Sequence, residues 1–439
     1  MTTRRASTPS TAAFAVRAAV EAKAGEGSPN APVTLPARGG TPTPCPTSTS
    51  PAADRTGAAG AKAEEERRVA CAPAIPPAPG RASTSGAGAP VTASAPVTPT
   101  ARLLLPAGAP AEKWHAARGL GAGGSDVAAL LGMDPHRGPL HVWLEKTGQA
   151  PPAHDARLER AARRGHALEG LVAEFFAEES GLTVLASPGT LQHVDHPHWI
   201  ANPDRLTLSA DDPGRDDLGV LECKTRTWRS ARTEGWNGDE APDRPAIQAH
   251  WYLNVTGYRH AYVAGLIDDD LTWWRLERDD ELCGLLADAV DRFWHDHVVA
   301  GIPPEPDGSH ATEELLARLW DAREDATVEV DPVEVMFLTQ RRRELKEQIA
   351  VLDGKLTETE NRMRALLGDA EVATVGGKPV ITWRQNGQFA HARFREAQPE
   401  LAAAYTRLAP AVDAERLAAE KPETYRQFRA RVLRVPSEG

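Results

Sequence analysis

The stretch that decides the fold runs from Asn202 to Lys224 and reads NPDRLTLSADDPGRDDLGVLECK. Within it, Arg205–Leu208 and Leu218–Cys223 are short runs rich in apolar residues, which predict two strands. Asp211–Asp217, between the two runs, is rich in Asp, Pro and Gly and is typical of a turn. We therefore expect two neighbouring strands that are joined by a polar turn.

Helical and strand patterns alternate on both sides of this pair. Apolar residues at helical spacing predict helices that begin at Ser125 or Asp126 as the N-cap and at Pro139, and that cover residues 155–180, 245–256 and 279–299. Further strands are expected at Thr183–Ala186, Thr190–Val194, Ala261–Ile267 and Leu271–Glu277. The alternation predicts an α/β (α+β) fold in which helices flank a mixed central sheet.

The two ends of the chain differ in composition from this central part. Residues 1–110 are dominated by Ala, Pro, Ser, Thr and Gly, which cannot bury enough apolar surface to fold, so we expect a disordered arm. Residues 111–302 form the predicted folded domain, which ends at the boundary Pro303–Pro306. Residues 303–439 are expected to hold a long amphipathic helix, a short hairpin around Val375–Lys378 and a helix over residues 399–431.

The long C-terminal helix is predicted from a heptad pattern. Its apolar residues fall on the 3-4 spacing of a heptad, at Leu338, Leu345, Ile349, Leu352, Leu356, Met363 and Leu366. Such spacing is typical of a helical hairpin or a coiled coil.

Charge and composition exclude several classes of protein. The 439-residue chain carries a net charge of −11, which argues against a surface that is basic throughout but allows a local basic groove for nucleic acid. Its four cysteines contain no CxxC pair, which argues against a disulfide framework or a zinc site. No apolar run is long enough to span a membrane, and Arg4-Arg5 lacks the apolar segment of a secretory signal. We expect a cytoplasmic protein without membrane contact.

Asp204, Glu222 and Lys224 are the sharpest candidates for chemistry. Because strand side chains alternate between faces, Glu222 and Lys224 share one face and Cys223 points away. Asp204 on the neighbouring strand could then bind a hard divalent cation together with Glu222, and the backbone carbonyl of Cys223 offers another oxygen. Such a cation, Mg²⁺ or Mn²⁺ in its place, polarises a phosphate and activates water, while the lysine steadies the developing negative charge. The alternative is a solvated ion pair, but the apolar Val220-Leu221 indicates a buried strand.

Five further residues are weaker candidates. Glu169 lies in the middle of the predicted helix 155–180 and is either a further metal ligand or a surface residue paired with an Arg. Gln248 and Tyr252 are four residues apart on one helix face and either line a substrate phosphate or pack. Arg118 and Ser125 flank a glycine-rich turn and either bind an anion at a helix start or only belong to a capped loop.

In this order, several segments resemble the YqaJ-type viral recombinase family. These proteins are relatives of phage lambda exonuclease with a restriction-endonuclease-like PD-(D/E)xK core. The resemblance covers roughly residues 114–300 and rests on GGSDVAALLG at 123–132, LHVWLEKTG at 140–148, GHALE at 165–169, NPD at 202–204, ECK at 222–224 and the segment 248–257.

The resemblance implies an exonuclease that degrades one strand of linear double-stranded DNA from its 5′ end. The remaining 3′ overhang would serve recombination with a single-strand annealing protein, and the enzyme would be a ring-shaped homotrimer. Asp204 and Glu222 resemble the magnesium ligands, and Lys224 resembles the catalytic lysine. Glu169 resembles a further metal ligand, and Gln248 resembles a residue that lines the site. Arg118 and Ser125 resemble the two residues that receive the 5′ phosphate.

Two departures from the family pattern and two rival functions accompany this expectation. Arg205 stands where the family often has Gly after Pro-Asp, and the span from Asp204 to Glu222 is long, which a hairpin extension can absorb. One rival is a RecB-like single-strand nuclease. The other is a non-catalytic DNA-end binding protein, against which the intact Asp204, Glu222 and Lys224 argue.

Overall fold

The computed structural model describes Val16 and residues 97–151, 156–208, 218–320, 326–384, 390–405 and 412–427. The chain divides into two compact units, residues 1–324 and 325–439. The arm expected to be disordered lies outside the described residues up to residue 96, apart from Val16, and so does the expected turn Asp211–Asp217.

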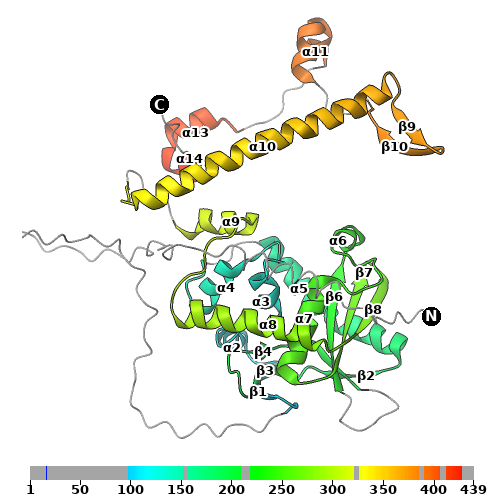
Figure 1. The fold of residues 1–439 in the computed structure, drawn as a ribbon, viewed down its shortest axis with the longest axis vertical. Helices are drawn as coiled ribbons and strands as arrows, with labels where there is room; N and C mark the ends of the chain where they lie inside the picture. Colours follow the sequence, from blue (N-terminus) through cyan, green and yellow to red (C-terminus); the bar gives the residue numbers. More distant parts are fainter. Residues whose placement is uncertain are drawn as a thin grey trace, which may run out of the picture. The chain divides into compact units, whose positions relative to one another are not determined.

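A five-stranded mixed sheet forms the centre of the first unit, in the order β2-β5-β6-β7-β8. Its strands are β2 (Thr183–Ala186), β5 (Arg205–Leu208), β6 (Leu218–Arg226), β7 (His260–Ile267) and β8 (Asp270–Glu277). Only β6 and β7 pair in parallel within this sheet, and the other neighbours are antiparallel. These two central strands are buried along most of their length, as strands covered on both faces are. The predicted mixed sheet flanked by helices is confirmed (Figure 1).

Two long helices cover the two faces of the sheet. On one face, α5 (Ala156–Ser180) packs Phe176 into a cluster with Leu221 and Cys223 of β6. On the other face, α7 (Asp243–Thr256) belongs to the larger core, which includes Val220. Alternate residues of β6 therefore point to α5 and to α7. This alternation assigns Glu222 to the α7 side.

The start of the folded region differs from the prediction. Residues 101–106, expected in the disordered arm, form β1 (Ala101–Pro106), which pairs with β3 (Gly189–His193) in a second sheet that also contains β4 (Ile200–Ala201). Ala101 is fully buried. The Ala- and Pro-rich composition concealed this strand because the three leucines that form it make up only a short run.

Several short helices complete the first unit: α2 (Ala111–Arg118), α3 (Gly124–Leu130), α4 (Pro139–Lys146), α6 (Trp228–Thr233), α8 (Asp280–Phe293) with a π-helical turn at Trp294–Val299, and α9 (His310–Leu319). The helix start at Pro139 is confirmed, but the N-cap at Ser125 or Asp126 is wrong, since Gly123 is the N-cap of α3. Leu315 and Leu319 of α9 lie in the core of this unit. The expected boundary at Pro303–Pro306 therefore lies inside the first unit, which ends at Glu324.

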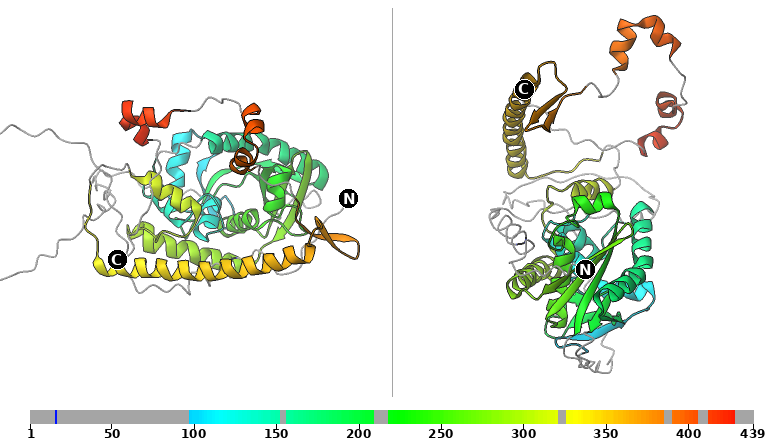
Figure 2. Two further views of the ribbon diagram at one scale, coloured as in Figure 1. Left: turned by 90° about the horizontal axis from the view of Figure 1, so that it is seen from above. Right: turned by 90° about the vertical axis from the view of Figure 1, so that its right-hand side faces the viewer.

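The second unit begins with the expected long helix, α10 (Pro332–Leu367), which Figure 2 shows as one unbroken rod. The hairpin β9 (Val372–Val375) and β10 (Lys378–Thr382) follows, and its turn needs the positive φ of Gly376 and Gly377. The single terminal helix expected over residues 399–431 is wrong. Its described part contains α12 (Pro399–Ala404), α13 (Ala414–Glu420) and α14 (Pro422–Gln427), after α11 (His391–Ala397).

Within the described residues, no helix is both long enough and apolar enough to cross a bilayer.

Candidate active site

Glu222 and Lys224 lie on one face of β6, as strand alternation predicts. The Glu222 side chain is 1% exposed, and Lys224 Nζ forms an ion pair with Glu222 Oε1. Among the described residues, no hydrogen-bond partner reaches Glu222 Oε2, although this atom is buried too. A buried carboxylate oxygen without a partner carries a large desolvation cost, so this position calls for a cation or a donor from outside the chain.

Asp204 lies immediately before β5 and reaches the same strand. The antiparallel register pairs Arg205 with Leu221, so the next step of the ladder brings Asp204 opposite Glu222. Directly opposed residues in an antiparallel pair point to the same face. In addition, Asp204 Oδ2 accepts a hydrogen bond of 2.8 Å from the backbone N–H of Cys223. The two predicted metal-binding carboxylates are therefore neighbours.

The electrostatics of these groups reflect an excess of negative charge. Burial and then the Asp204 carboxylate raise the pKa of Glu222 to about 8, against the opposing effect of Lys224. Burial also raises the pKa of Asp204, again opposed by Lys224. Burial alone would lower the pKa of Lys224, but Glu222 and Asp204 raise it above its ordinary value. One lysine does not neutralise both acids, so a divalent cation would be favourable here.

Glu169 borders this group from α5. Its side chain is 25% exposed, and Glu169 Oε2 lies 3.1 Å from His166 Nδ1. Burial raises the pKa of Glu169, and the Asp204 carboxylate raises it further. The structure therefore brings Glu169 into electrostatic contact with the candidate metal ligands, while His166 supplies its present partner.

The carboxylates do not form a closed metal cage. Across the described ranges, no three His, Cys, Asp or Glu side chains converge closely enough to hold a metal ion by themselves. Mg²⁺ in proteins is usually bound by only one or two carboxylates, and waters and substrate phosphates complete its octahedron. Asp204 and Glu222 fit this open arrangement, with Glu169 and the Cys223 carbonyl as additional predicted oxygen ligands.

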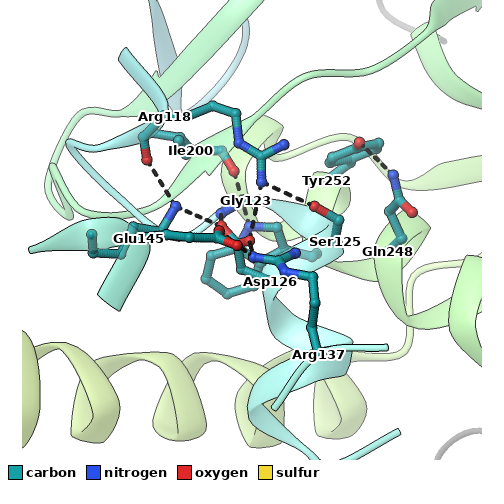
Figure 3. A network of polar contacts seen from close by, with 11 residues as sticks. Arg118, Gly123, Ser125, Asp126, Arg137, Glu145, Ile200, Gln248 and Tyr252 are labelled. Carbon is teal, nitrogen blue, oxygen red and sulfur yellow. Dashed lines mark hydrogen bonds and ion pairs between the residues drawn. The ribbon is translucent and has the colours of Figure 1, made fainter. Parts of the chain in front are cut away.

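The four predicted phosphate-binding residues form a second group where α3 meets α7. Gln248 Nε2 donates to Tyr252 Oη at 2.8 Å, and Arg118 donates to Ser125 Oγ at 3.3 Å (Figure 3). The helices touch at Gly124, where a Cβ atom would lie 2.7 Å from Gln248 Cγ. The two pairs are therefore close together, and Gly124 is required for this approach.

Tyr252 connects the two groups. Burial raises its pKa well above the ordinary value, and the Glu222 and Asp204 carboxylates raise it further. Tyr252 therefore keeps its hydroxyl proton, and the acidic group acts on it electrostatically.

Asp126 is a further functional candidate, for which the sequence predicts only a helix cap. Its carboxylate is fully buried and accepts from Arg118 at 3.1 Å and from Arg137 at 2.9 Å (Figure 3). Lys146 Nζ forms an ion pair with the same carboxylate at 2.7 Å. It also accepts from the Gly123 backbone N–H at 3.0 Å. Burial alone would raise the pKa of Asp126, but Lys146, Arg118 and Arg137 hold it well below its usual range. The residue thus ties three cations to the start of α3.

Comparison with known proteins assigns the chain to a family. Residues 113–259 match the model of the YqaJ-like viral recombinase domain. The chain is 33% identical over 288 residues to the uncharacterized protein YqaJ of Bacillus subtilis (strain 168), and the alignment covers 62% of this chain and 85% of that protein. The chain belongs to the YqaJ-like viral recombinase family. The predicted resemblance is thereby confirmed.

Two of the solved structures with some similarity to this YqaJ-family chain are exonucleases by name. The alkaline exonuclease LHK-Exo from Laribacter hongkongensis is 20% identical, with a TM-score of 0.35 over 43% of this chain and 93% of that one. A phage related exonuclease from Haemophilus somnus 129PT is 13% identical, with a TM-score of 0.26 over 37% of this chain and 81% of that one.

The region matched by the YqaJ-like family model contains the whole candidate site. Every predicted site residue, from Arg118 to Tyr252, lies between residues 113 and 259, and so do Asp126, Arg137 and Lys146. In contrast, α10 lies beyond the matched region.

Proposed function

We propose that this family member is a metal-dependent deoxyribonuclease, an exonuclease that digests linear double-stranded DNA. The observation that carries the proposal is the buried and, among described residues, unpartnered Glu222 Oε2 beside Asp204 and Lys224. A solvated ion pair on a strand edge would have neither the burial nor the second carboxylate. In metal-dependent phosphodiester hydrolysis, acidic groups hold the cation and a cationic side chain stabilises the developing negative charge.

In this proposal Asp204 and Glu222 hold Mg²⁺, or Mn²⁺ in its place, with Glu169 and the Cys223 carbonyl as additional ligands. A cation held there would polarise the scissile phosphate and lower the pKa of water. Lys224, kept protonated by its two acidic neighbours, stabilises the negative charge that develops on the phosphate oxygens.

The second group supplies the orientation of the substrate. Arg118 and Ser125, at the start of α3, are proposed to receive the 5′ phosphate of the strand that is digested. Gln248 and Tyr252 are proposed to line the path from this phosphate to the acidic group, since Tyr252 is electrostatically coupled to Glu222. This arrangement would give 5′-to-3′ polarity and leave a 3′ strand for a single-strand annealing protein. A homotrimer would enclose the duplex.

The decisive experiment compares DNA forms. Purified protein is incubated with blunt linear duplex, with closed circular duplex and with single strands, each with Mg²⁺ or with EDTA. We expect Mg²⁺-dependent digestion of the linear duplex alone. Preference for single strands would instead favour a RecB-like nuclease, and binding without digestion would favour a DNA-end binding protein.

Two variants locate the activity at the proposed site. Glu222→Gln keeps the size of the side chain but removes its charge, and should abolish digestion while the protein still retains DNA. Glu178→Gln, an exposed position on α5, is the matched control and should digest at the parental rate. Parental digestion by the Glu222 variant would show that the site is misplaced.

A further inference from the structure

The helix α10 exposes an apolar seam. Leu345, Ile349, Leu352 and Leu356 are 41%, 56%, 62% and 58% exposed, and they are alternately four and three residues apart. At about 1.5 Å per residue, the 36-residue helix is about 54 Å long. Large apolar side chains that recur at heptad spacing along a helix are typical of a helix that packs along another helix.

The described remainder of the second unit offers no helix of matching length. The helices α11, α12, α13 and α14 have only six or seven residues each, which corresponds to about 9–11 Å. Among the described helices of this unit, α10 is therefore the one that is long enough to cover such a seam.

Two polar residues interrupt the seam, and they determine whether two paired helices run parallel or antiparallel. The a positions of the heptad are Val335, Arg342, Ile349, Leu356 and Met363, and the d positions are Leu338, Leu345, Leu352, Thr359 and Leu366. In a parallel pair in register, a faces a, so the two copies of Arg342 would meet inside the seam. Like charges in a desolvated seam are strongly unfavourable. The parallel arrangement is therefore disfavoured.

In an antiparallel pair, each a position faces a d position of the second copy. When Ile349 lies opposite Leu352, the layers become Val335 with Leu366, Leu338 with Met363, Arg342 with Thr359, and Leu345 with Leu356. The two polar residues then meet each other, and every other layer is apolar. A shift by one heptad in either direction would place both of them against apolar residues. A polar layer of this kind specifies register in coiled coils.

The flanking positions are compatible with this register. Lys346 lies opposite Asp353 at two symmetry-related places, which is attractive. Arg341 lies opposite Arg362, but each of them is paired within its own helix, with Glu344 at 3.7 Å and with Glu358 at 2.6 Å. The centre of the register also lies near the middle of α10, so almost the whole helix is used.

We propose that α10 is a self-association element, and that it pairs antiparallel with α10 of a second copy of this chain in the register that sets Arg342 opposite Thr359. The pairing joins two copies through the second unit, independently of any contact made by the nuclease unit.

The first test measures particle mass in solution. The full chain of 47.1 kDa should form assemblies with an even number of copies, as determined by light scattering or sedimentation. The double variant Ile349→Asp/Leu352→Asp should halve that mass. Val351→Asp is the matched control, because Val351 is equally exposed at 59% but lies off the seam, and it should leave the mass unchanged. An unchanged mass in the double variant, or a monomeric parent, overturns the proposal.

The second test measures orientation by cysteine cross-linking. Differently tagged full-length chains that carry Val335→Cys and Leu366→Cys are mixed and oxidised, beside a parent that has only its native cysteines. The antiparallel register predicts cross-links between the two variants and none within Val335→Cys alone, whose two thiols would lie about 46 Å apart. Self-cross-linking of Val335→Cys would show a parallel pair and overturn the proposed register. Neither test depends on DNA digestion, so both remain informative if the proposed function is wrong.

Discussion

Lys224 Nζ is paired with one carboxylate oxygen of Glu222, and no described residue provides a hydrogen bond to the other oxygen, which is buried as well. The asymmetry is informative, because natural proteins seldom leave a buried carboxylate oxygen without a partner. Asp204 adds a second carboxylate on the same side of the strand and increases the local negative charge. A cation bound between the two acids would offset the energetic cost of burying them.

The first prediction concerns how the stability of the metal-free protein depends on pH. The pKa of Glu222 rises from 4.5 to about 8 on folding, through burial and the Asp204 carboxylate, so between these values the folded protein binds more protons than the unfolded chain. Its contribution to stability is therefore present below about pH 4.5 and is lost as the pH rises through about 8. In EDTA, the Tm of the parent should fall more steeply between about pH 4.5 and 8 than the Tm of Glu222→Gln. Each kcal/mol of lost stability corresponds to a fall of about 2–4 °C in Tm.

Mg²⁺ provides the internal control for this prediction. At the alkaline end of the range, added Mg²⁺ should raise the Tm of the parent and leave that of Glu222→Gln unchanged, because ligand binding stabilises only the state that binds. Equal slopes for parent and variant in EDTA would contradict the elevated pKa of Glu222. If Mg²⁺ raised the Tm of parent and variant equally, the ion would bind at another site.

The second prediction concerns Lys224→Gln. The substitution removes the charge that stabilises the transferring phosphate but keeps a hydrogen-bond donor. The rate of digestion under saturating DNA should fall by about 10²–10³-fold, the usual effect of losing one group that stabilises the developing charge. Retention of DNA in a gel-shift assay with Ca²⁺ should remain within about twofold, because phosphate contacts elsewhere supply most of the affinity. Lys378→Gln, on the exposed hairpin β9–β10, serves as the control. If DNA retention fell as much as the rate of digestion, Lys224 would act in DNA binding.

The acidic group could be predicted from the sequence because its geometry is local. Strand alternation places Glu222 and Lys224 on one face and Cys223 on the other, and the adjoining strand brings Asp204 near. The seam of α10 was predictable for the same reason, since the heptad spacing is a property of one helix.

The partners of Asp126 could not be predicted, because they come from three different parts of the chain. Arg118 ends α2, Arg137 precedes α4, and Lys146 ends α4. No periodicity relates these positions, and only the packing of the three helices brings them together. The strand β1 was missed because its neighbour β3 lies more than eighty residues further along the chain, and the composition of the arm gives no sign of that pairing.

The third prediction concerns the choice of DNA ends. If Arg118 receives the terminal 5′ phosphate, Arg118→Ala should slow digestion of 5′-phosphorylated duplex by about 10- to 100-fold, the value of a charge-assisted hydrogen bond of about 1.5–3 kcal/mol. Digestion of the same duplex with a 5′ hydroxyl should change little. Lys113→Ala, an exposed cation on the same helix, controls for the general loss of positive charge. If Arg118→Ala slows both substrates equally, Arg118 does not recognise the terminal phosphate.

The fourth prediction concerns Asp126, which holds Arg118, Arg137 and Lys146 beside the proposed phosphate site. Asp126→Asn keeps the shape of the side chain and an acceptor for the Gly123 N–H, but leaves three neighbouring cations without their shared anion. Removing one member of a buried ion pair costs about 3–5 kcal/mol, so the free energy of unfolding in urea should fall by that amount. Asp288→Asn, an exposed position on α8, should change it by less than about 0.5 kcal/mol. A destabilisation of Asp126→Asn as small as that of the control would mean that the three cations are held in place without the buried carboxylate.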